Sequence, residues 1–229
     1  MKHLVFALII AVALGMASAA FAADIVTCPT ANQLKAGEVD VAGYYIFLDF
    51  PEPMLQYVRV QTLYVGVTDR LELDLHRYDL DRIAPETLWI ASYKVHSEDA
   101  KMPDVVVGAK DLADRVGNPA MPRKTSYFVA AAKTLNLPAP GSPPDLPLYR
   151  LHLGVGTEDP SLLGEDRHDG AFGGIQVLVN SKIGVIALYD SADLITGVTY
   201  TPKPNWPTFK AGTFGDHTWV GINYTFGVK

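Results

Sequence analysis

The stretch Thr218–Val228, TWVGINYTFGV, decides the fold class of this chain of 229 residues. Apolar side chains occupy every second position of it: Val220, Ile222, Tyr224, Phe226 and Val228. After Trp219, the positions between them hold only Gly, Asn and Thr. Successive side chains of a β-strand point to opposite faces, so this alternation predicts a strand with one apolar face and one largely polar face.

Two earlier stretches repeat the alternation with charged residues on the polar face. In Leu71–Tyr78 three leucines alternate with Glu, Asp and His, and in Tyr149–Gly156 apolar residues alternate with Arg, His and Gly. Helical periodicity is limited to the short stretch 109–114. Strands with one apolar face and one polar face occur in two architectures. A water-soluble sandwich or barrel turns the apolar face inward, whereas an outer-membrane barrel turns it toward lipid.

The pattern recurs along the chain and predicts about twelve strands. They are expected at residues 40–50, 55–67, 70–79, 87–96, 103–110, 125–135, 147–156, 171–180, 182–190, 194–201, 206–213 and 217–228. The length of most of these strands is close to the roughly 9–11 residues that a tilted strand needs to cross a bilayer. It exceeds the length of about five or six residues that is typical of strands in soluble sheets. We therefore expect an all-β protein, an antiparallel up-and-down β-barrel of about 12 strands of the outer-membrane type.

Composition excludes several classes of protein. The chain is 48% hydrophobic, which argues for a folded core, and its single cysteine excludes a disulfide scaffold and a multi-Cys zinc site. A formal charge of −6 argues against nucleic-acid binding by phosphate neutralisation. Cys28 is expected to be an unpaired thiol, because Thr27 precedes it where lipidation would require a small residue.

Residues 1–22 are expected to be a secretory signal peptide, followed by a single β-barrel domain over 23–229. Lys2 precedes an uncharged apolar run over Leu4–Leu14, and Ala20-Phe21-Ala22 supplies small residues for cleavage. The alternative is an uncleaved membrane anchor over Leu4–Ala23, which has about the length that spans a bilayer.

A series of short motifs runs through nearly all of the chain after the signal peptide. In order, they are Pro29-Thr30-Ala31 with Gly37-Glu38, Tyr64–Leu73, Pro103–Leu112, Ser126–Lys133, Leu153–Gly156, Gly170–Ile175, Ala187–Asp190 and Val220–Phe226. This series resembles the YjbH-type family of outer-membrane β-barrel proteins, although Val106 stands where that family has Ala. The resemblance implies an outer-membrane β-barrel protein associated with exopolysaccharide export, and because members of that family are usually much larger, this chain would be a minimal, single-barrel version.

Five charged or histidine side chains lie on the polar faces of two predicted strands: Glu72, Asp74, His76, Arg150 and His152. In an outer-membrane barrel these faces line the lumen, so the five residues are weak candidates for contact with sugar hydroxyls. An equally good interpretation is that they satisfy one another in a closed lumen.

No catalytic residue, metal site or cofactor is predicted. None of the six histidines lies in a Gly-x-Ser-x-Gly or His-Glu-x-x-His context. A hydrolase that uses His152 or His217 is retained only as a weak third alternative. The oxygen-rich stretches Asp79–Arg82 and Glu165–Gly170 lack the ligand spacing of an EF-hand and are interpreted as solvated loops rather than calcium sites.

The expected function is that of a non-enzymatic outer-membrane barrel in exopolysaccharide or envelope polysaccharide secretion, as a pore or a structural accessory. The expected partners are outer-membrane lipid, the barrel-insertion machinery and polysaccharide or export-system proteins, with no nucleic acid. The alternative is a soluble periplasmic β-barrel or sandwich that binds a ligand.

Overall fold

The computed structural model describes residues 28–49, 56–81, 85–112, 125–136, 146–157, 159–160, 166–167 and 169–227. The strands are β1 (Glu38–Phe47), β2 (Tyr57–Gly66), β3 (Leu71–Leu80), β4 (Glu86–His96), β5 (Asp104–Lys110), β6 (Ser126–Thr134), β7 (Leu148–Gly156), β8 (Asp159–Pro160), β9 (Asp166–Arg167), β10 (Gly170–Leu178), β11 (Ile183–Tyr189), β12 (Leu194–Tyr200), β13 (Thr208–Phe214) and β14 (His217–Gly227). Over these ranges no helix has the length and hydropathy to span a membrane. The predicted signal peptide lies outside the described residues.

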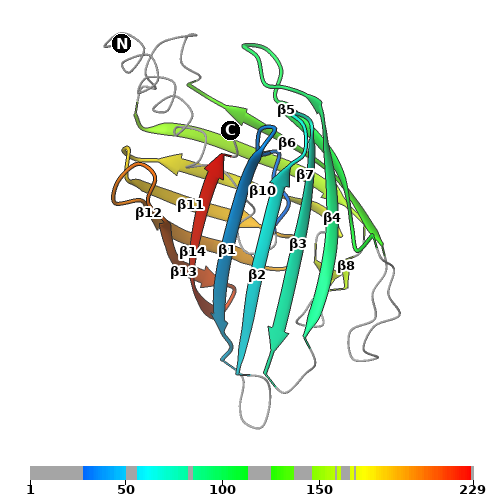
Figure 1. Cartoon of the computed structure of the whole chain (residues 1–229), viewed down its shortest axis with the longest axis vertical. Helices are drawn as coiled ribbons and strands as arrows, with labels where there is room; N and C mark the ends of the chain where they lie inside the picture. Colours follow the sequence, from blue (N-terminus) through cyan, green and yellow to red (C-terminus); the bar gives the residue numbers. More distant parts are fainter. Residues whose placement is uncertain are drawn as a thin grey trace.

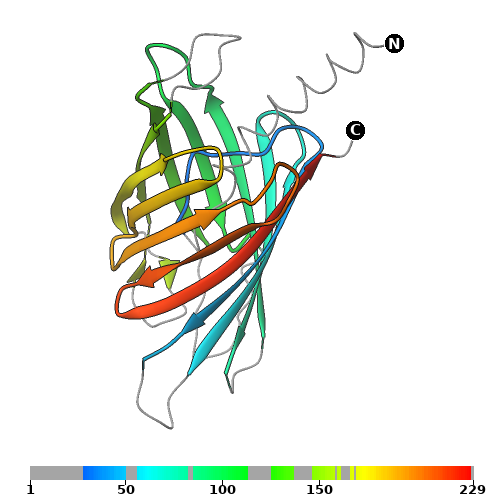
Figure 2. The same ribbon diagram turned by 90° about the vertical axis from the view of Figure 1, so that its left-hand side faces the viewer.

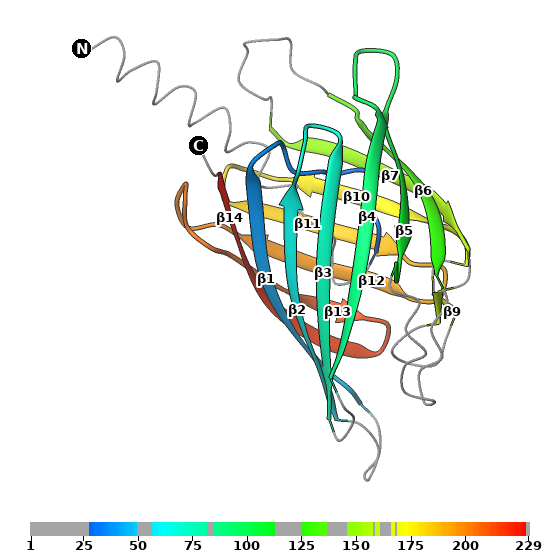
Figure 3. The ribbon, with the colours of Figure 1, turned by 45° about the vertical axis from the view of Figure 1, so that its right-hand side comes forward.

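Twelve of these strands form one closed antiparallel barrel (Figure 1). Each barrel strand pairs with its neighbours in the chain, and β1 closes the ring by pairing with β14 (Figure 3). The predicted fold class is confirmed, and each of the twelve predicted segments overlaps one barrel strand, with ends that differ by up to three residues. The two-residue strands β8 and β9, which the sequence pattern did not predict, pair with each other in the connection between β7 and β10.

The apolar faces of the strands lie on the outside of the barrel, and their polar faces lie on the inside. In β7, Leu151, Leu153 and Val155 are 39%, 71% and 56% exposed. Arg150 and His152, which alternate with them along the strand, are buried. The same alternation runs around the barrel, with exposed Val41, Leu63, Leu73, Trp89, Val107, Val129, Val185, Val198, Phe209 and Ile222 on the outer surface. These side chains therefore do not form the protein core that the soluble alternative requires.

The half of the lumen farther from the start of β1 and the end of β14 is packed mainly with apolar side chains, with the buried Lys110 and Asp190 among them. Trp219, Leu188 and Ile195 each have 0% of their surface exposed. Aromatic rings lie over inward-facing glycines in four places: Tyr44 over Gly221, Phe128 over Gly108, Phe172 over Gly154 and Trp219 over Gly197. Glycine makes this packing possible, because a Cβ at any of these four positions would lie within 3 Å of the ring.

Candidate functional site

The lumen contains a chain segment that precedes the first strand. Residues 28–37, which we call the luminal segment, run inside the ring of strands before β1 begins (Figure 2). At the rim, the Ala36 backbone N–H donates to the Asp69 carboxylate, and Gly37 adopts a φ of 77° as the chain turns into β1. At the other end of the segment Cys28 is 1% exposed and belongs to the same apolar cluster as the luminal aromatic residues. Its Sγ lies 3.9 Å from the carbonyl oxygen of Pro29.

Polar contacts tie the luminal segment to four strands. The Asn32 Oδ1 accepts from Arg150 Nε of β7 at 2.7 Å, and its Nδ2 donates to Gln176 Oε1 of β10 at 3.2 Å. Gln33 Nε2 donates to Ser92 Oγ of β4 at 2.7 Å. The backbone N–H of Leu34 donates to Glu72 Oε2 of β3 at 2.7 Å. The segment therefore bridges two pairs of neighbouring strands, β3–β4 and β7–β10, that lie apart in the sheet.

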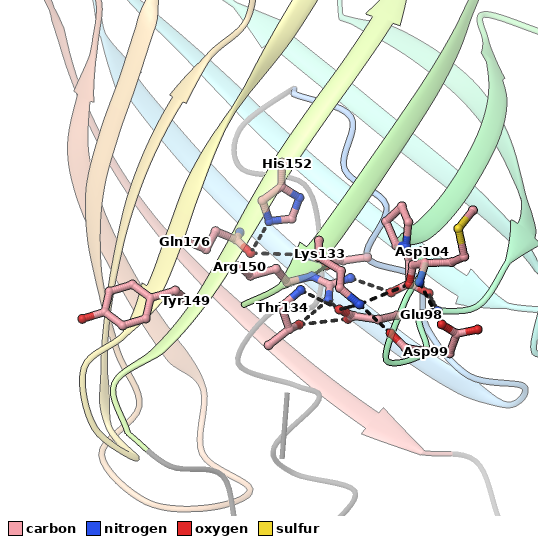
Figure 4. A network of polar contacts seen from close by, with 12 residues as sticks. Glu98, Asp99, Asp104, Lys133, Thr134, Tyr149, Arg150, His152 and Gln176 are labelled. Carbon is pink, nitrogen blue, oxygen red and sulfur yellow. Dashed lines mark hydrogen bonds and ion pairs between the residues drawn. The ribbon is translucent and has the colours of Figure 1, made fainter. Parts of the chain in front are cut away.

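Arg150 is the centre of this network (Figure 4). Its Nη1 contacts Glu98 Oε2 at 2.7 Å and Thr134 Oγ1 at 2.9 Å, and its Nη2 contacts Asp104 Oδ2 at 2.6 Å. Together with the bond to Asn32, the guanidinium group donates to four different side chains. The Arg150 side chain is only 9% exposed, so these acceptors replace the water that would otherwise solvate the charge.

The turn between β4 and β5 is held to the same network. The carboxylate of Glu98 also accepts from the Thr134 backbone N–H at 2.6 Å, and its own backbone N–H donates to Asp104 Oδ1 at 2.8 Å. Lys133 Nζ donates to the Asp99 carbonyl oxygen at 2.5 Å. Backbone N–H groups within the turn, of Met102 and Lys101, lower the pKa of the exposed Asp99 carboxyl group.

All five predicted lumen residues face the interior and are buried, with exposed fractions of 7% for Glu72, 4% for Asp74, 1% for His76, 7% for Arg150 and 3% for His152. The structure links three of them through the luminal segment: Arg150 and His152 by way of Asn32 and Gln176, and Glu72 by way of the Leu34 backbone. The His76 ring packs edge-on against Tyr64, and His152 Nε2 contacts Gln176 Oε1 at 3.0 Å. Their contact with a ligand remains a prediction.

Several members of the network were not predicted from the sequence. Asp104 and Thr134 lie at the ends of predicted strands, and their inward parity is a usable signal. Glu98 lies in a turn and Asn32 in a segment without periodicity, so no pattern indicates either residue. A second polar cluster was also missed: Asp40, which is 0% exposed, accepts from Asn223 Nδ2 at 2.9 Å and from the Thr225 hydroxyl.

The arrangement pairs buried charge, with the Arg150 guanidinium against the carboxylates of Glu98 and Asp104. Among the described residues, no group of three or more His, Cys, Asp or Glu side chains is placed to hold a metal ion. His217 Nδ1 accepts from the Asp49 backbone N–H at 3.2 Å, a contact that involves no serine. In the first oxygen-rich stretch Asp79 forms an ion pair with Arg59 at 2.7 Å, while the side chains of 165–168 lie outside the described residues.

No protein-family model and no curated protein matches this sequence. Among solved structures, the chain is similar to a KdgM porin, at 11% identity and a TM-score of 0.49, with 84% of this chain and 99% of that chain covered. A KdgM porin in complex with disordered oligogalacturonate gives 13% identity and a TM-score of 0.49, with the same coverage of 84% and 99%. The N-terminal β-barrel domain of Pseudomonas aeruginosa OprF gives 10% identity and a TM-score of 0.27, covering 84% of this chain and 100% of that chain. At these values the roles of those proteins do not transfer to this chain.

Proposed function

We propose that this chain is a non-enzymatic β-barrel of the outer membrane that serves envelope polysaccharide secretion as a structural accessory. The membrane assignment rests on the exposed apolar side chains of the outer surface. Apolar side chains of β7 such as Leu153 point away from the barrel, and the described chain places no layer over them. A closed barrel also pairs every strand, which removes the unpaired sheet edges that hydrocarbon does not tolerate.

The filled lumen favours an accessory role over an open pore. Apolar side chains with no exposed surface, Trp219 and Leu188 among them, occupy one half of the lumen. The luminal segment and the Arg150 network occupy the half nearer the termini. Conduction through this conformation would require both the apolar side chains and the luminal segment to move. The luminal segment is held in place by the Arg150 network, which consists largely of charge-assisted hydrogen bonds.

The association with polysaccharide secretion is supported by the resemblance of the motif series to the YjbH-type family. Both chain termini of an even-stranded bacterial barrel lie on the periplasmic side, so the end at which β1 begins and β14 ends would face the periplasm. Components of an export system would approach that end.

The membrane assignment is tested by fractionation of expressing cells and a heat-modifiability gel on the outer-membrane fraction. We expect an outer-membrane band whose mobility changes on boiling. Recovery in the soluble periplasmic fraction without such a shift would refute the assignment.

The role in secretion is tested separately by deleting the gene and measuring exported polysaccharide. We expect a reduced yield that the wild-type gene restores, and an unchanged yield would refute the role.

The filled lumen is tested in planar bilayers. We expect the purified protein to show no sustained open channel, and a stable open conductance would refute a filled, non-conducting lumen.

A further inference from the structure

The outer face of β2 and β3 changes from apolar to charged within two steps of the strand register. Leu63 lies opposite Leu75, and the next outward pair toward the end away from the termini is Gln61 opposite Arg77. The pair after that is Arg59 opposite Asp79. The outward row therefore passes from leucine to arginine on both strands, as a membrane-facing surface does where hydrocarbon ends.

If the leucine pair marks the edge of the hydrocarbon, Arg77 lies at the depth of the lipid headgroups, and Arg59 lies just beyond them, from where its long side chain can reach back to the layer. One register step is two residues, or about 7 Å along a strand, which is about 5 Å along the membrane normal for a strand tilted by about 45°. Arg77 would then lie about 5 Å and Arg59 about 10 Å beyond Leu75. The headgroup layer of a leaflet is roughly 5–8 Å thick.

Two tyrosines adjoin the arginines: Tyr45 at the register step of Arg59, and Tyr57 one step farther out, where the exposed Phe47 lies opposite it. Tyr45 of β1 lies opposite Arg59, and its ring stacks on that of Tyr57 with centroids 5.1 Å apart. The Arg59 guanidinium lies 5.5 Å from the centroid of the Tyr57 ring. Tyr57 is one further register step out, about 15 Å beyond Leu75, which is deeper into the aqueous side than a glycerophospholipid headgroup extends. Stacked tyrosines at that height suit the sugars of a glycolipid, because their rings pack on C–H faces and their hydroxyls bond sugar hydroxyls.

The arginines are placed to share one phosphate group. They occupy diagonal positions of an antiparallel pair, about 7–8 Å apart at the backbone, so both side chains reach a common anion. Asp79 contacts one Arg59 nitrogen at 2.7 Å, and the Arg59 side chain remains 49% exposed, with further N–H donors available. Arg77 is exposed and lies opposite uncharged Gln61 and Thr87. Over the two register steps beyond the leucine pair, Arg59, Arg77 and Asp79 sum to +1, which suits a phosphate at that depth, whereas Asp81 follows farther out beside the backbone of Tyr57.

We infer that Arg59 and Arg77 bind the phosphate of a phosphorylated glycolipid in the outer leaflet, with Tyr45 and Tyr57 against its sugars. The inference rests on the proposed insertion in the outer membrane and adds to it a lipid class and a binding surface. The bound glycolipid would anchor the long β1–β3 edge of the barrel at the outer surface.

The test uses the purified full chain in detergent and measures its dissociation constant for bis-phosphorylated lipid A by native mass spectrometry. The double variant Arg59→Gln/Arg77→Gln is compared with the wild type and with Arg70→Gln. Arg70 is a matched control, because it is an exposed arginine in the turn at the other end of the β2–β3 hairpin. We expect the double variant to bind lipid A at least about tenfold more weakly, the loss of one charge-assisted bond or more, and Arg70→Gln to bind as the wild type does.

Three further ligands separate the possible sources of phosphate. Dephosphorylated lipid A, phosphatidylglycerol and inorganic phosphate should each bind the wild type at least about tenfold more weakly than lipid A does. Unchanged lipid A affinity in the double variant would overturn the inference, as would equal affinity for phosphatidylglycerol or for free phosphate. If the double variant loses heat modifiability, Arg77→Gln alone decides, since Arg77 has no ion pair in the described structure. A wild type without heat modifiability would instead refute the proposed membrane function.

Discussion

We expect the substitution Arg150→Met to lower the free energy of unfolding of the barrel, because Arg150 is the centre of the buried polar network. Arg150→Met removes four side-chain hydrogen bonds and leaves the carboxylates of Glu98 and Asp104 without their guanidinium partner. Both carboxylates are poorly solvated, with side-chain exposures of 8% and 12%. Removal of one partner from a buried ion pair costs about 3–5 kcal/mol. Lys133 lies 3.6 Å from Glu98 and compensates part of that charge, so we expect a loss of about 3 kcal/mol in the free energy of unfolding.

The assay is urea unfolding in detergent micelles or lipid vesicles, followed by tryptophan fluorescence. Arg70→Met is the control, because substitution of an exposed side chain in a turn changes stability by about 0.5 kcal/mol or less. The triple variant Arg150→Met/Glu98→Gln/Asp104→Asn removes the uncompensated charges and should recover part of the stability. A loss below about 1 kcal/mol in Arg150→Met, or no recovery in the triple variant, would show that the network does not stabilise the barrel through charge pairing.

Three other predictions follow from burial and packing. Gly154→Val should lower the free energy of unfolding by about 1–3 kcal/mol, because its Cβ would lie 2.2 Å from the Phe172 ring, whereas Gly43→Val should be near neutral, with nothing within 4 Å of its Cβ. Equal effects in urea unfolding would contradict the glycine–aromatic packing. Leu153→Arg should cost about 2–4 kcal/mol in vesicles if Leu153 faces the bilayer midplane, and a cost near zero would argue against a lipid-facing position. Cys28, at 1% exposure, should react with a maleimide only after unfolding, and rapid labelling of the folded protein would show that the luminal segment leaves the lumen.

The strand pattern could be predicted because it is a local property of the sequence. In β3, Leu73 faces outward and His76 inward, as the period of two requires. The same parity placed Glu72, Asp74, His76, Arg150 and His152 inside the barrel before any partner was known. The membrane interpretation of the apolar faces followed from strand length and count.

The contacts inside the lumen could not be predicted in the same way. Asn32 and Arg150 are separated by 118 residues, and their hydrogen bond exists only because the closed ring brings β7 around to the luminal segment. Glu98 reaches Arg150 from a turn whose conformation has no periodic signal.

The sequence by itself therefore determined the twelve barrel strands and the side of the sheet that their residues occupy, because alternation along a strand needs only neighbouring residues. Only the tertiary structure decided what fills the lumen and which charges pair there. Those contacts depend on the closure of the ring and on the path of the luminal segment through it, and both join residues that are far apart in the chain.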